Sequence, residues 1–370
     1  MRILHLAKYY WPHSGGMERV VQDLAEGAAT LGHDVDVVAY ESGGRRDGRR
    51  QHSRITRVFS LGAVGAQELA PGYLTAARRS ADIVHLHHPH TLADFAALSR
   101  GRRTPLVITQ HADGNHRGFR RLLARTALKR ASAIVVPSRA HVALSPELVG
   151  HESKVEVIPF GVDIERWITV PSPPAGSPPK AIFIGRLVRY KGVDILLRAL
   201  ERVPDLRLDI VGSGPESSRL KTLARALAIT DRIRWFGEYP DEDLPRRMAE
   251  ADFLVLPSVT VEEMFGLVVI EAMAASRPVI TTALPSGVRE VNVSGDTGLE
   301  VPLRDVDALA RALDMLAHDS ALRARMGENG RLRAERYFSR RRMVQEHLAL
   351  YQRLVDAAEA GRAPEPWQKL

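Results

Sequence analysis

Two glutamates flank the start of a predicted helix in the segment Pro257–Ala274. Gly266 ends the preceding loop, and an apolar run rich in helix-forming residues follows it. Glu263 is therefore expected just ahead of the helix, with Glu271 between one and two turns inside it. Such a helix end offers free N–H groups and a positive dipole, which suit phosphate or sugar oxygens. The two carboxylates could hold the hydroxyl groups of two polyols, such as a sugar and a ribose.

The alternative is that Glu263 is only a helix-capping acid and Glu271 only a solvated surface charge. The residues on both sides of Glu271, from Val268 to Ala274, are apolar. This pattern predicts a mostly buried helix, in which a lone acid needs a specific partner. We therefore favour the binding role.

Two further loops combine glycines with charge or with a helix start. Arg186 and Lys191 lie between Gly185 and Gly192 after a predicted strand, and such a pair of cations can clamp a diphosphate. Gly15 and Gly16 precede a helix predicted from about Glu18 to Leu31, and a glycine pair lets backbone amides approach a ligand. By themselves, such pairs are more often surface cations and turns.

The elements that must position these residues alternate between β-branched strands and helices, which indicates parallel sheets covered by helices. The predicted strands are 2–7, 34–40, 83–87, 106–110, 133–137 and 155–158, then 180–184, 206–211, 233–236, 253–256 and 278–281. The proline-rich stretch Pro171–Pro179 separates the two series. A length of 370 residues also favours two domains.

Several of these segments together resemble one family. The two glutamates form an E-x7-E pattern. Three segments earlier in the chain, Val157–Asp163, Gly185–Gly192 and Val211–Pro215, resemble further motifs of retaining glycosyltransferases of family 4, also called glycosyl transferases group 1, in the same order and spacing. The resemblance implies the GT-B fold, with two Rossmann-like, doubly wound α/β domains facing a cleft. It implies an N-terminal acceptor-side domain at 1–165, a nucleotide-sugar domain at 166–342 and a helix at 343–370 that crosses back.

The resemblance also implies residue roles. Glu263 would hold the sugar, His111 would face the transferred sugar, and Arg186 and Lys191 would stabilise the leaving diphosphate. Contacts to the nucleotide sugar are expected from Gly15, Gly16, Arg186, Lys191, Trp235, Met264, Phe265, Gly266, Leu267 and Glu271. The chain departs from the family pattern at Phe160, at Ser276 in place of a glycine, and at Ser286 in the stretch that ends at Glu290.

Two other patterns suggest cofactors that we do not expect. The run His85–His90 is rich in imidazoles, but no nearby carboxylate or cysteine completes a metal site. In Gly212–Glu216 the dinucleotide-binding pattern fails, because Ser217 occupies the place of its third glycine. The sequence thus predicts an enzyme that needs neither a metal nor a nicotinamide.

Composition and charge bear on the partners. The chain has no cysteine, no apolar run of membrane-spanning length and no evident secretory signal, so we expect a cytoplasmic protein. Its net charge is +8, and six basic residues without an acid lie in 117–130 among apolar ones. This pattern predicts either a solvated helix face or a helix that contacts an anionic membrane at its inner face. No nucleic-acid-binding motif is present.

The function implied by the resemblance is transfer of a hexose, with retention, from a UDP- or GDP-linked sugar to an acceptor hydroxyl. Bacterial surface polysaccharide or glycolipid assembly is the expected setting, with a sugar or lipid-linked sugar as acceptor. A sugar phosphorylase and a nucleotide-sugar epimerase or hydrolase of the same fold are alternatives. The alternative ranked last is a non-catalytic sugar- or nucleotide-binding protein.

Overall fold

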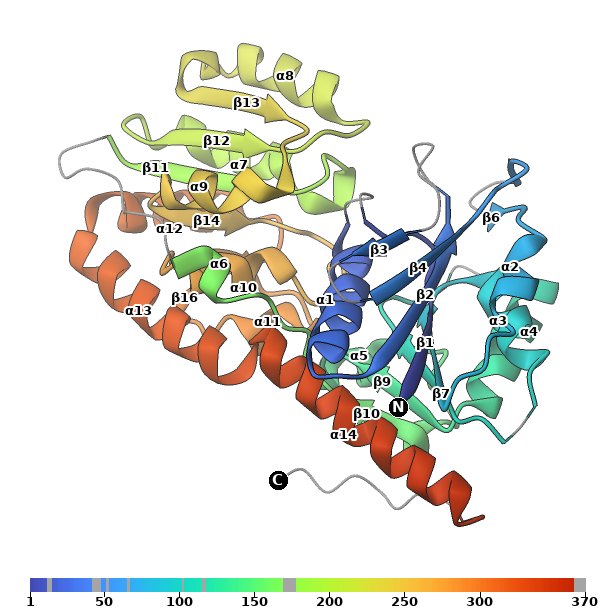
Figure 1. Ribbon diagram of the computed structural model, residues 1–370. Coiled ribbons are helices and arrows are strands. Elements are labelled where there is room, and N and C mark those ends of the chain that lie inside the picture. Colours follow the sequence, from blue (N-terminus) through green and yellow to red (C-terminus); the bar gives the residue numbers. More distant parts are fainter. Residues whose placement is uncertain are drawn as a thin grey trace. The chain divides into compact units, whose positions relative to one another are not determined.

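The computed structural model describes residues 1–11, 15–41, 48–50, 53–64, 67–101, 103–114, 118–168 and 178–362. The chain forms two compact units, coloured by sequence in Figure 1. The first comprises Met1–Phe160 with Arg340–Leu370, and the second Gly161–Ser339. The division falls a few residues before the predicted domain boundaries at 165 and 342. The predicted linker 171–179 lies largely outside the described residues.

The first unit contains a sheet in the order β10-β9-β8-β7-β1-β2-β4-β3, in which only β3 is antiparallel to its neighbour. The strands expected from the sequence are β1 Arg2–Leu6, β2 Asp34–Tyr40, β7 Ile83–His88, β8 Leu106–Gln110, β9 Ala133–Val136 and β10 Val155–Val157. The strands that were not predicted are β3 Gly48–Arg50, β4 Ser53–Val58, β5 Ala63–Val64 and β6 Gln67–Glu68. In β4, Arg54 and Arg57 interrupt the apolar pattern that marks the other strands.

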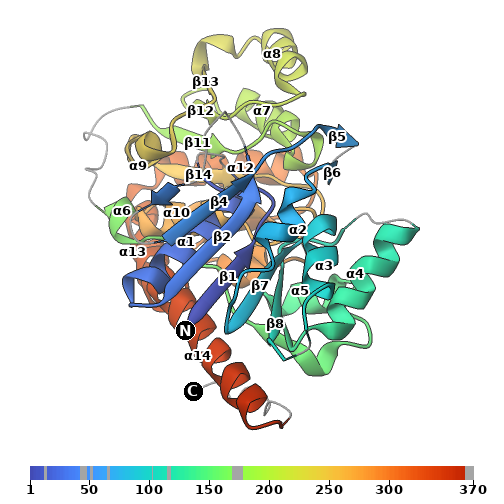
Figure 2. The same ribbon diagram turned by 45° about the vertical axis from the view of Figure 1, so that its right-hand side comes forward.

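Helices cover both faces of this sheet, as Figures 1 and 2 show. They are α1 Gly16–Thr30, α2 Gly72–Ala76, α3 Thr91–Leu98, α4 Phe119–Arg130, α5 Arg139–Leu144 and α14 Arg340–Glu359. Successive residues of β1 alternate between two cores: Ile3 packs with residues of α1 and α14, and Leu4 with residues of α2, α3 and α4. Helix α14 begins three residues before the predicted Met343 and belongs to the first unit.

The second unit contains a fully parallel sheet in the order β13-β12-β11-β14-β15-β16. Its strands are β11 Lys180–Ile184, β12 Arg207–Val211, β13 Ile233–Gly237, β14 Phe253–Leu256, β15 Val279–Thr282 and the unpredicted β16 Gly298–Val301. Its helices are α6 Glu165–Ile168, α7 Val193–Glu201, α8 Ser217–Ala226, α9 Leu244–Ala249, α10 Leu267–Ala274, α11 Val288–Val291, α12 Val306–His318 and α13 Ser320–Tyr337.

Each sheet has one point where the chain reverses its direction of travel across the strands. In the first unit this point lies between β1 and β7, and in the second between β11 and β14. Loops that leave the carboxyl ends of such strand pairs diverge to opposite sides and form the usual ligand sites of doubly wound sheets. Except for Trp235, the predicted site residues of the second unit lie on the loops after β11 and β14 or on helix α10, which follows the second of these loops.

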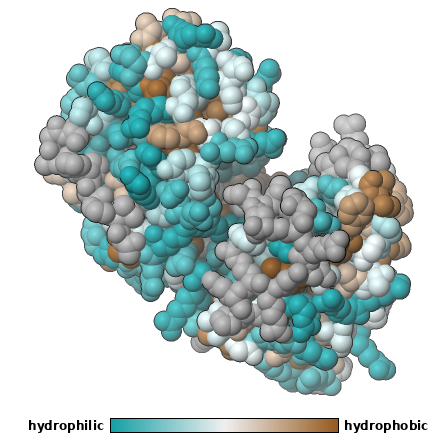
Figure 3. Space-filling view, turned by 45° about the horizontal axis from the view of Figure 1, so that its top comes forward, coloured by the Kyte–Doolittle hydropathy of each residue, from teal (hydrophilic) through white to brown (hydrophobic). Residues whose placement is uncertain are grey.

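The described residues include no helix that is both long and apolar enough to cross a membrane. In Figure 3, hydrophilic residues predominate on the face that is shown, and apolar residues are scattered or gathered in small groups.

Candidate functional site

The loops after β11 and β14 approach each other closely at Gly192. This glycine has a φ of +66°, and a Cβ atom there would lie 2.1 Å from the carbonyl oxygen of Pro257. Only glycine tolerates both this conformation and this contact. The amide of Val259 donates a hydrogen bond to the carbonyl of Tyr190 at 2.7 Å, which also joins the two loops. The side chains that follow on each loop are therefore brought together.

Lys191 and Glu263 meet at this junction. The Lys191 ammonium lies 2.5 Å from Oε2 of Glu263, and the two side chains are only 12% and 9% exposed. Burial lowers the pKa of Lys191, but the adjacent Glu263 carboxylate raises it more, so the pKa is raised overall. The pair is thus an ion pair at neutral pH.

Ser258 supports Glu263 from the same loop. Its hydroxyl donates to Oε2 of Glu263 at 2.8 Å, and the hydroxyl of Thr282 in turn donates to the Ser258 carbonyl. Both Ser258 and Thr282 are buried. Ser258 was not among the predicted site residues, although its position two residues after the buried strand β14 is where such a residue is expected.

Arg186 lies on the same loop as Lys191, and the structure leaves its side chain exposed. Within the described part of the chain its guanidinium has no hydrogen-bond or ion-pair partner. The loop base is fixed by glycines: a Cβ on Gly212 would lie 2.0 Å from the carbonyl oxygen of Gly185, and one on Gly214 would lie 2.3 Å from that of Leu187. Arg186 is thus an exposed cation on a well-fixed loop.

The helix after Glu263 begins as the sequence predicted. Helix α10 starts at Leu267, directly after Gly266, whose φ is +74°. Phe265 is buried, and the carbonyl of Met264 accepts a hydrogen bond from the amide of Gly287 at 2.9 Å. Glu271 lies in the second turn of α10 and is buried. The amide of Val269 donates to the Gly266 carbonyl at 2.8 Å, and the amides of Leu267 and Val268 have no acceptor within the helix, because it has no earlier turn.

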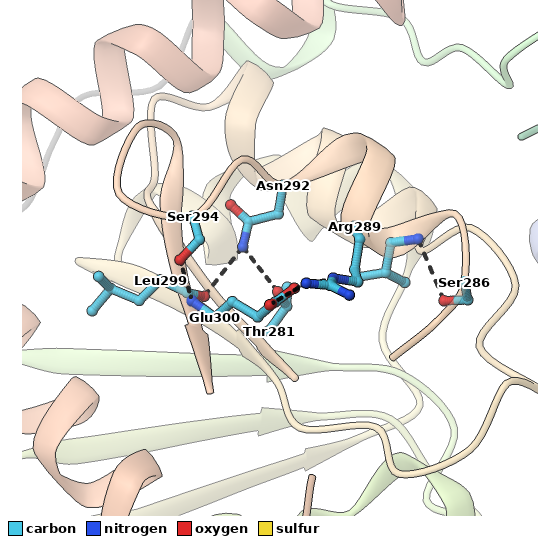
Figure 4. Close-up of polar contacts among 8 residues, drawn as sticks. Thr281, Ser286, Arg289, Asn292, Ser294, Leu299 and Glu300 are labelled. Atoms are coloured by element: carbon cyan, nitrogen blue, oxygen red, sulfur yellow. Dashed lines mark hydrogen bonds and ion pairs between the residues drawn. The ribbon is translucent and has the colours of Figure 1, made fainter. Parts of the chain in front are cut away.

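Figure 4 shows the polar contacts that fix the neighbouring helix α11. The Asn292 amide donates to the hydroxyl of Thr281 at 2.8 Å and to the carbonyl of Leu299 at 3.1 Å. Arg289 forms a two-point ion pair with Glu300 at 2.7 and 3.0 Å. These contacts hold α11, and with it the loop that binds the Met264 carbonyl, against β15 and β16.

Trp235 lies apart from this cluster. It is half-buried on the edge strand β13, two strands from β11, and the Lys221 ammonium lies 5.8 Å from its ring centroid. A contact between Trp235 and a nucleotide base stays a prediction.

In the first unit, the glycine pair begins a helix at the strand switch point. Gly15 is the N-cap of α1 in an extended conformation, and Gly16 is its first residue, so the helix begins two residues before the predicted Glu18. The amide of Arg19 donates to the Gly15 carbonyl at 3.0 Å. The placement fits a ligand-binding loop, and the contact itself stays a prediction.

His111 follows β8, and its surroundings were not expected. Its Nε2 lies 3.1 Å from Nδ1 of His87, and Nε2 of His87 lies 3.1 Å from Nδ1 of His5. Burial lowers the pKa of His5 and of His111 to about 3, and that of His87 well below its usual value. All three imidazoles are therefore neutral at physiological pH.

The His-rich strand brings three imidazoles together. Ring nitrogens of His5, His85 and His87 lie within 4.8 Å of one another, a spacing compatible with a metal. However, both nitrogens of His85 bond to protein partners, Thr109 at 2.7 Å and Tyr351 at 2.5 Å, and both of His87 bond to imidazoles. Hydrogen bonds thus account for both nitrogens of His85 and of His87, whereas Nε2 of His5 is buried without a partner among the described residues. The absence of a metal site stays a prediction. His5 was not among the predicted site residues, and β-strand pairing places it opposite His85.

The comparisons with known proteins agree with this arrangement. The model for glycosyl transferases group 1 matches residues 167–333, and that for glycosyltransferase family 4 matches residues 14–166. The chain is 28% identical to O-antigen chain mannosyltransferase C of Escherichia coli, over 96% of this chain and 100% of that protein. It is 33% identical to a GDP-mannose-dependent alpha-(1-6)-phosphatidylinositol monomannoside mannosyltransferase of Mycolicibacterium smegmatis, over 65% of this chain and 67% of that protein.

A solved structure shares the whole fold. The sucrose-phosphate synthase of Thermosynechococcus elongatus superposes with a TM-score of 0.83 at 23% identity, covering 96% of this chain and 99% of that one. Three observations lead to one conclusion: two helix-covered sheets of mainly parallel strands, loops at their switch points, and the two matched family models. The chain belongs to the family 4 (group 1) glycosyltransferases of the GT-B fold and is a glycosyltransferase.

Proposed function

We propose that the protein transfers a hexose, with retention and without a metal, from a nucleoside diphosphate sugar to an acceptor hydroxyl of a polysaccharide or glycolipid. The observation that carries this proposal is the buried pair of Lys191 and Glu263 next to the start of α10. It brings a cation and a carboxylate together close to the first amides of a helix, which suits a sugar attached to a diphosphate.

In the proposed mechanism the bond between the sugar's anomeric carbon and the diphosphate breaks as negative charge develops on the departing phosphate. Lys191, Arg186 and the amide groups at Leu267 stabilise that charge, which is electrostatic catalysis. Glu263 holds the sugar's hydroxyl groups and Glu271 the ribose, so that positioning contributes much of the rate. These cations and amides supply the role that a divalent ion plays in other transferases.

The acceptor oxygen then bonds to the anomeric carbon on the face that the phosphate leaves. Its proton passes to the departing phosphate oxygen, so no enzyme base is consumed. His111 is proposed to contact the transferred sugar, and Gly15 and Gly16 to lie at the diphosphate or acceptor. His111 is neutral, since burial lowers its pKa to about 3, and it therefore acts as a hydrogen-bonding group and not as an acid or base near pH 7.

The test uses a panel of UDP- and GDP-sugars with excess EDTA, following donor hydrolysis and ligand-induced thermal shift. One responsive donor identifies nucleotide and sugar. Glu263→Ala should then lower turnover by about 10²- to 10³-fold, the usual effect of removing one preorganised group. Glu262→Ala is the matched control, because Glu262 is exposed and bonds only the hydroxyl of Thr260 at 3.1 Å among the described residues. Equal effects of the two variants would refute the role of Glu263.

The alternatives predict different readouts in the same panel. A phosphorylase would respond to inorganic phosphate with a sugar phosphate and would ignore nucleotides. An epimerase or hydrolase would consume the donor at full rate without any acceptor. A binding protein would give a thermal shift without turnover, although the placement of a cation against a buried carboxylate favours catalysis.

We also propose that the acceptor is lipid-linked and that α4 rests on an anionic membrane at its cytoplasmic face. The exposed side of α4 carries Arg121, Arg125 and Lys129 together with Phe119 and Leu122, which are 70% and 63% exposed. The opposite side of α4 is buried and carries Leu123, Ala124, Ala127 and Leu128. Only some of the apolar residues of this segment can therefore contact a membrane. Basic residues beside exposed apolar ones favour an anionic lipid surface.

Pelleting with vesicles of phosphatidylglycerol and phosphatidylcholine tests the membrane contact. Wild type should bind in proportion to the anionic lipid and lose binding in high salt, because each basic residue near the surface contributes about 1 kcal/mol. Replacing Arg121, Arg125 and Lys129 by glutamate should abolish binding. The same change at the exposed Arg207, Arg225 and Arg246 of the second unit is the control. Equal loss of binding in both triple variants would show that the net charge of the protein, and not helix α4, determines binding.

A further inference from the structure

Three imidazoles form a hydrogen-bonded chain from the core of the first unit to His111. His5 lies on β1, His87 on β7 and His111 directly after β8, which are neighbouring strands of one sheet. The links are Nδ1 of His5 to Nε2 of His87 and Nδ1 of His87 to Nε2 of His111, each 3.1 Å. Ring centroids 5.4 and 5.3 Å apart confirm that the rings are neighbours.

A neutral imidazole carries one proton on two nitrogens, so each ring in the chain donates through one nitrogen and accepts through the other. Each of the two links needs one proton. The whole chain therefore has two self-consistent states, with all protons directed toward His111 or all directed toward His5. The tautomer of His111 cannot change without a change in His87 and in His5.

The buried end of the chain distinguishes the two states. Nε2 of His5 is buried and has no hydrogen-bond partner among the described residues. A proton there would be an orphaned buried N–H, which costs more than an unused lone pair. His5 therefore carries its proton on Nδ1 and donates to His87, and His87 donates from Nδ1 to Nε2 of His111. The proton of His111 is left on Nδ1, the nitrogen that has no partner within the described part of the chain.

We infer that the His5–His87 pair holds His111 in the tautomer protonated on Nδ1, so that this half-buried ring presents a neutral hydrogen-bond donor to the transferred sugar. His5 and His87 are positioning residues, since they act through His111. The fixed tautomer follows from the chain itself, whereas its use in transfer rests on the proposed function of His111.

His85 provides the matched control. It is as deeply buried as His87, lies on the same strand and packs against the His87 ring with centroids 4.3 Å apart. Its own nitrogens bond to Thr109 and Tyr351 and so lie outside the chain. His85→Leu disturbs the packing and leaves both links intact. His5→Leu removes the end of the chain, and His5→Asn restores an amide donor at the place of Nδ1.

The first readout is the imidazole nitrogen NMR shifts of isotope-labelled protein, with the His111 signal assigned through His111→Gln. Wild type, His5→Asn and His85→Leu should show His111 protonated on Nδ1, and His5→Leu should show both tautomers. A wild-type His111 protonated on Nε2 overturns the inference, and so does an equal shift in His85→Leu and His5→Leu. If His5→Leu does not fold, the tautomer of His111 in the wild type and in the His87→Asn variant decides whether the inference holds.

The second readout is turnover with the donor found in the panel. His5→Leu should lower kcat about tenfold with the donor KM unchanged, the rate equivalent of one neutral hydrogen bond, and His5→Asn should restore it. Unchanged kcat in a His5→Leu protein with mixed tautomers would overturn the positioning role. If wild type turns over no nucleotide sugar, the proposed function fails, while the NMR result still decides the tautomer.

Discussion

Lys191 and Glu263 are 72 positions apart in the chain, yet their charged atoms lie 2.5 Å from each other in a nearly buried ion pair. They meet because β11 and β14 are neighbours in the sheet and Gly192 allows the two following loops to touch. This site and the unit that carries His111 can both be tested by substitution and by pH.

The ion pair should be strongly coupled in stability. Lys191→Ala leaves the Glu263 carboxylate with Ser258 as its remaining described partner and should cost about 3 kcal/mol in free energy of unfolding. Adding Glu263→Ala should restore part of that loss, since no buried charge remains. A double-mutant cycle in urea measures the coupling, and additive losses would contradict it.

The pH dependence of this coupling follows from the raised pKa of Lys191. The raised pKa stabilises the folded protein fully at pH values below 10.5, the pKa of lysine in the unfolded chain. This stabilisation is lost as the pH rises through the higher pKa of Lys191 in the folded protein. The coupling should therefore be constant from about pH 6 to 9 and decline only in alkaline solution. A decline already between pH 6 and 9 would contradict the raised pKa.

Gly192→Ala should destabilise the second unit through two effects. A residue other than glycine at φ +66° costs about 1–2 kcal/mol, and contact with the Pro257 carbonyl adds about 1–3 kcal/mol. Gly237 has nearly the same φ, +65°, but a Cβ atom added there would meet no other atom within 4 Å, so Gly237→Ala should show only the first effect. Urea unfolding compares the two variants, and equal losses would show that the loop contact is not tight.

Ser276→Gly should stabilise the protein. Ser276 has a φ of +56°, in the left-handed region where a side chain costs about 1 kcal/mol or more, and the family pattern has a glycine there. The expected gain is up to about 1 kcal/mol, reduced by the greater freedom of glycine in the unfolded chain. Ala275→Gly is the control: Ala275 has a φ of −82°, so its replacement should lower stability. Thermal unfolding of both variants checks the opposite signs.

The first unit should lose stability in mild acid. Burial lowers the pKa to about 3 in His5, His90 and His111 and to about 4 in His141 and His347. A lowered pKa contributes stability that is present above the unfolded value of 6.5 and is lost as the pH falls toward the native value. Each of these groups should therefore lower the free energy of unfolding by about 1.4 kcal/mol per pH unit below about 6.5.

Hydrogen exchange with mass spectrometry at pH 7 and pH 5 can follow each unit separately. Peptides from the first unit should lose protection at pH 5, whereas the second unit, whose one histidine is the exposed His318, should change little. His88 acts in the opposite sense, because Asp94 outweighs burial and raises its pKa. Equal loss in both units would show that the buried imidazoles do not govern acid stability.

Much of the fold could be predicted from the sequence because buried parallel strands are short runs of apolar, β-branched residues. Strands such as β4, where Arg54 and Arg57 alternate with apolar residues, and the short β16 lack that signal and were missed. The helix start at Leu267 was predicted for a local reason, since Gly266 ends the loop and an apolar helix-forming run follows.

The sequence by itself determined the two-unit α/β architecture, the loops that bear charge and the family, because these depend on local patterns and on motif order. Only the tertiary structure showed that Ser258 supports Glu263, that α4 buries part of its apolar residues, and that His5 joins His87 and His111. Such contacts depend on which strands become neighbours, and in a parallel sheet neighbouring strands come from distant parts of the chain. Local sequence carries no signal for that pairing.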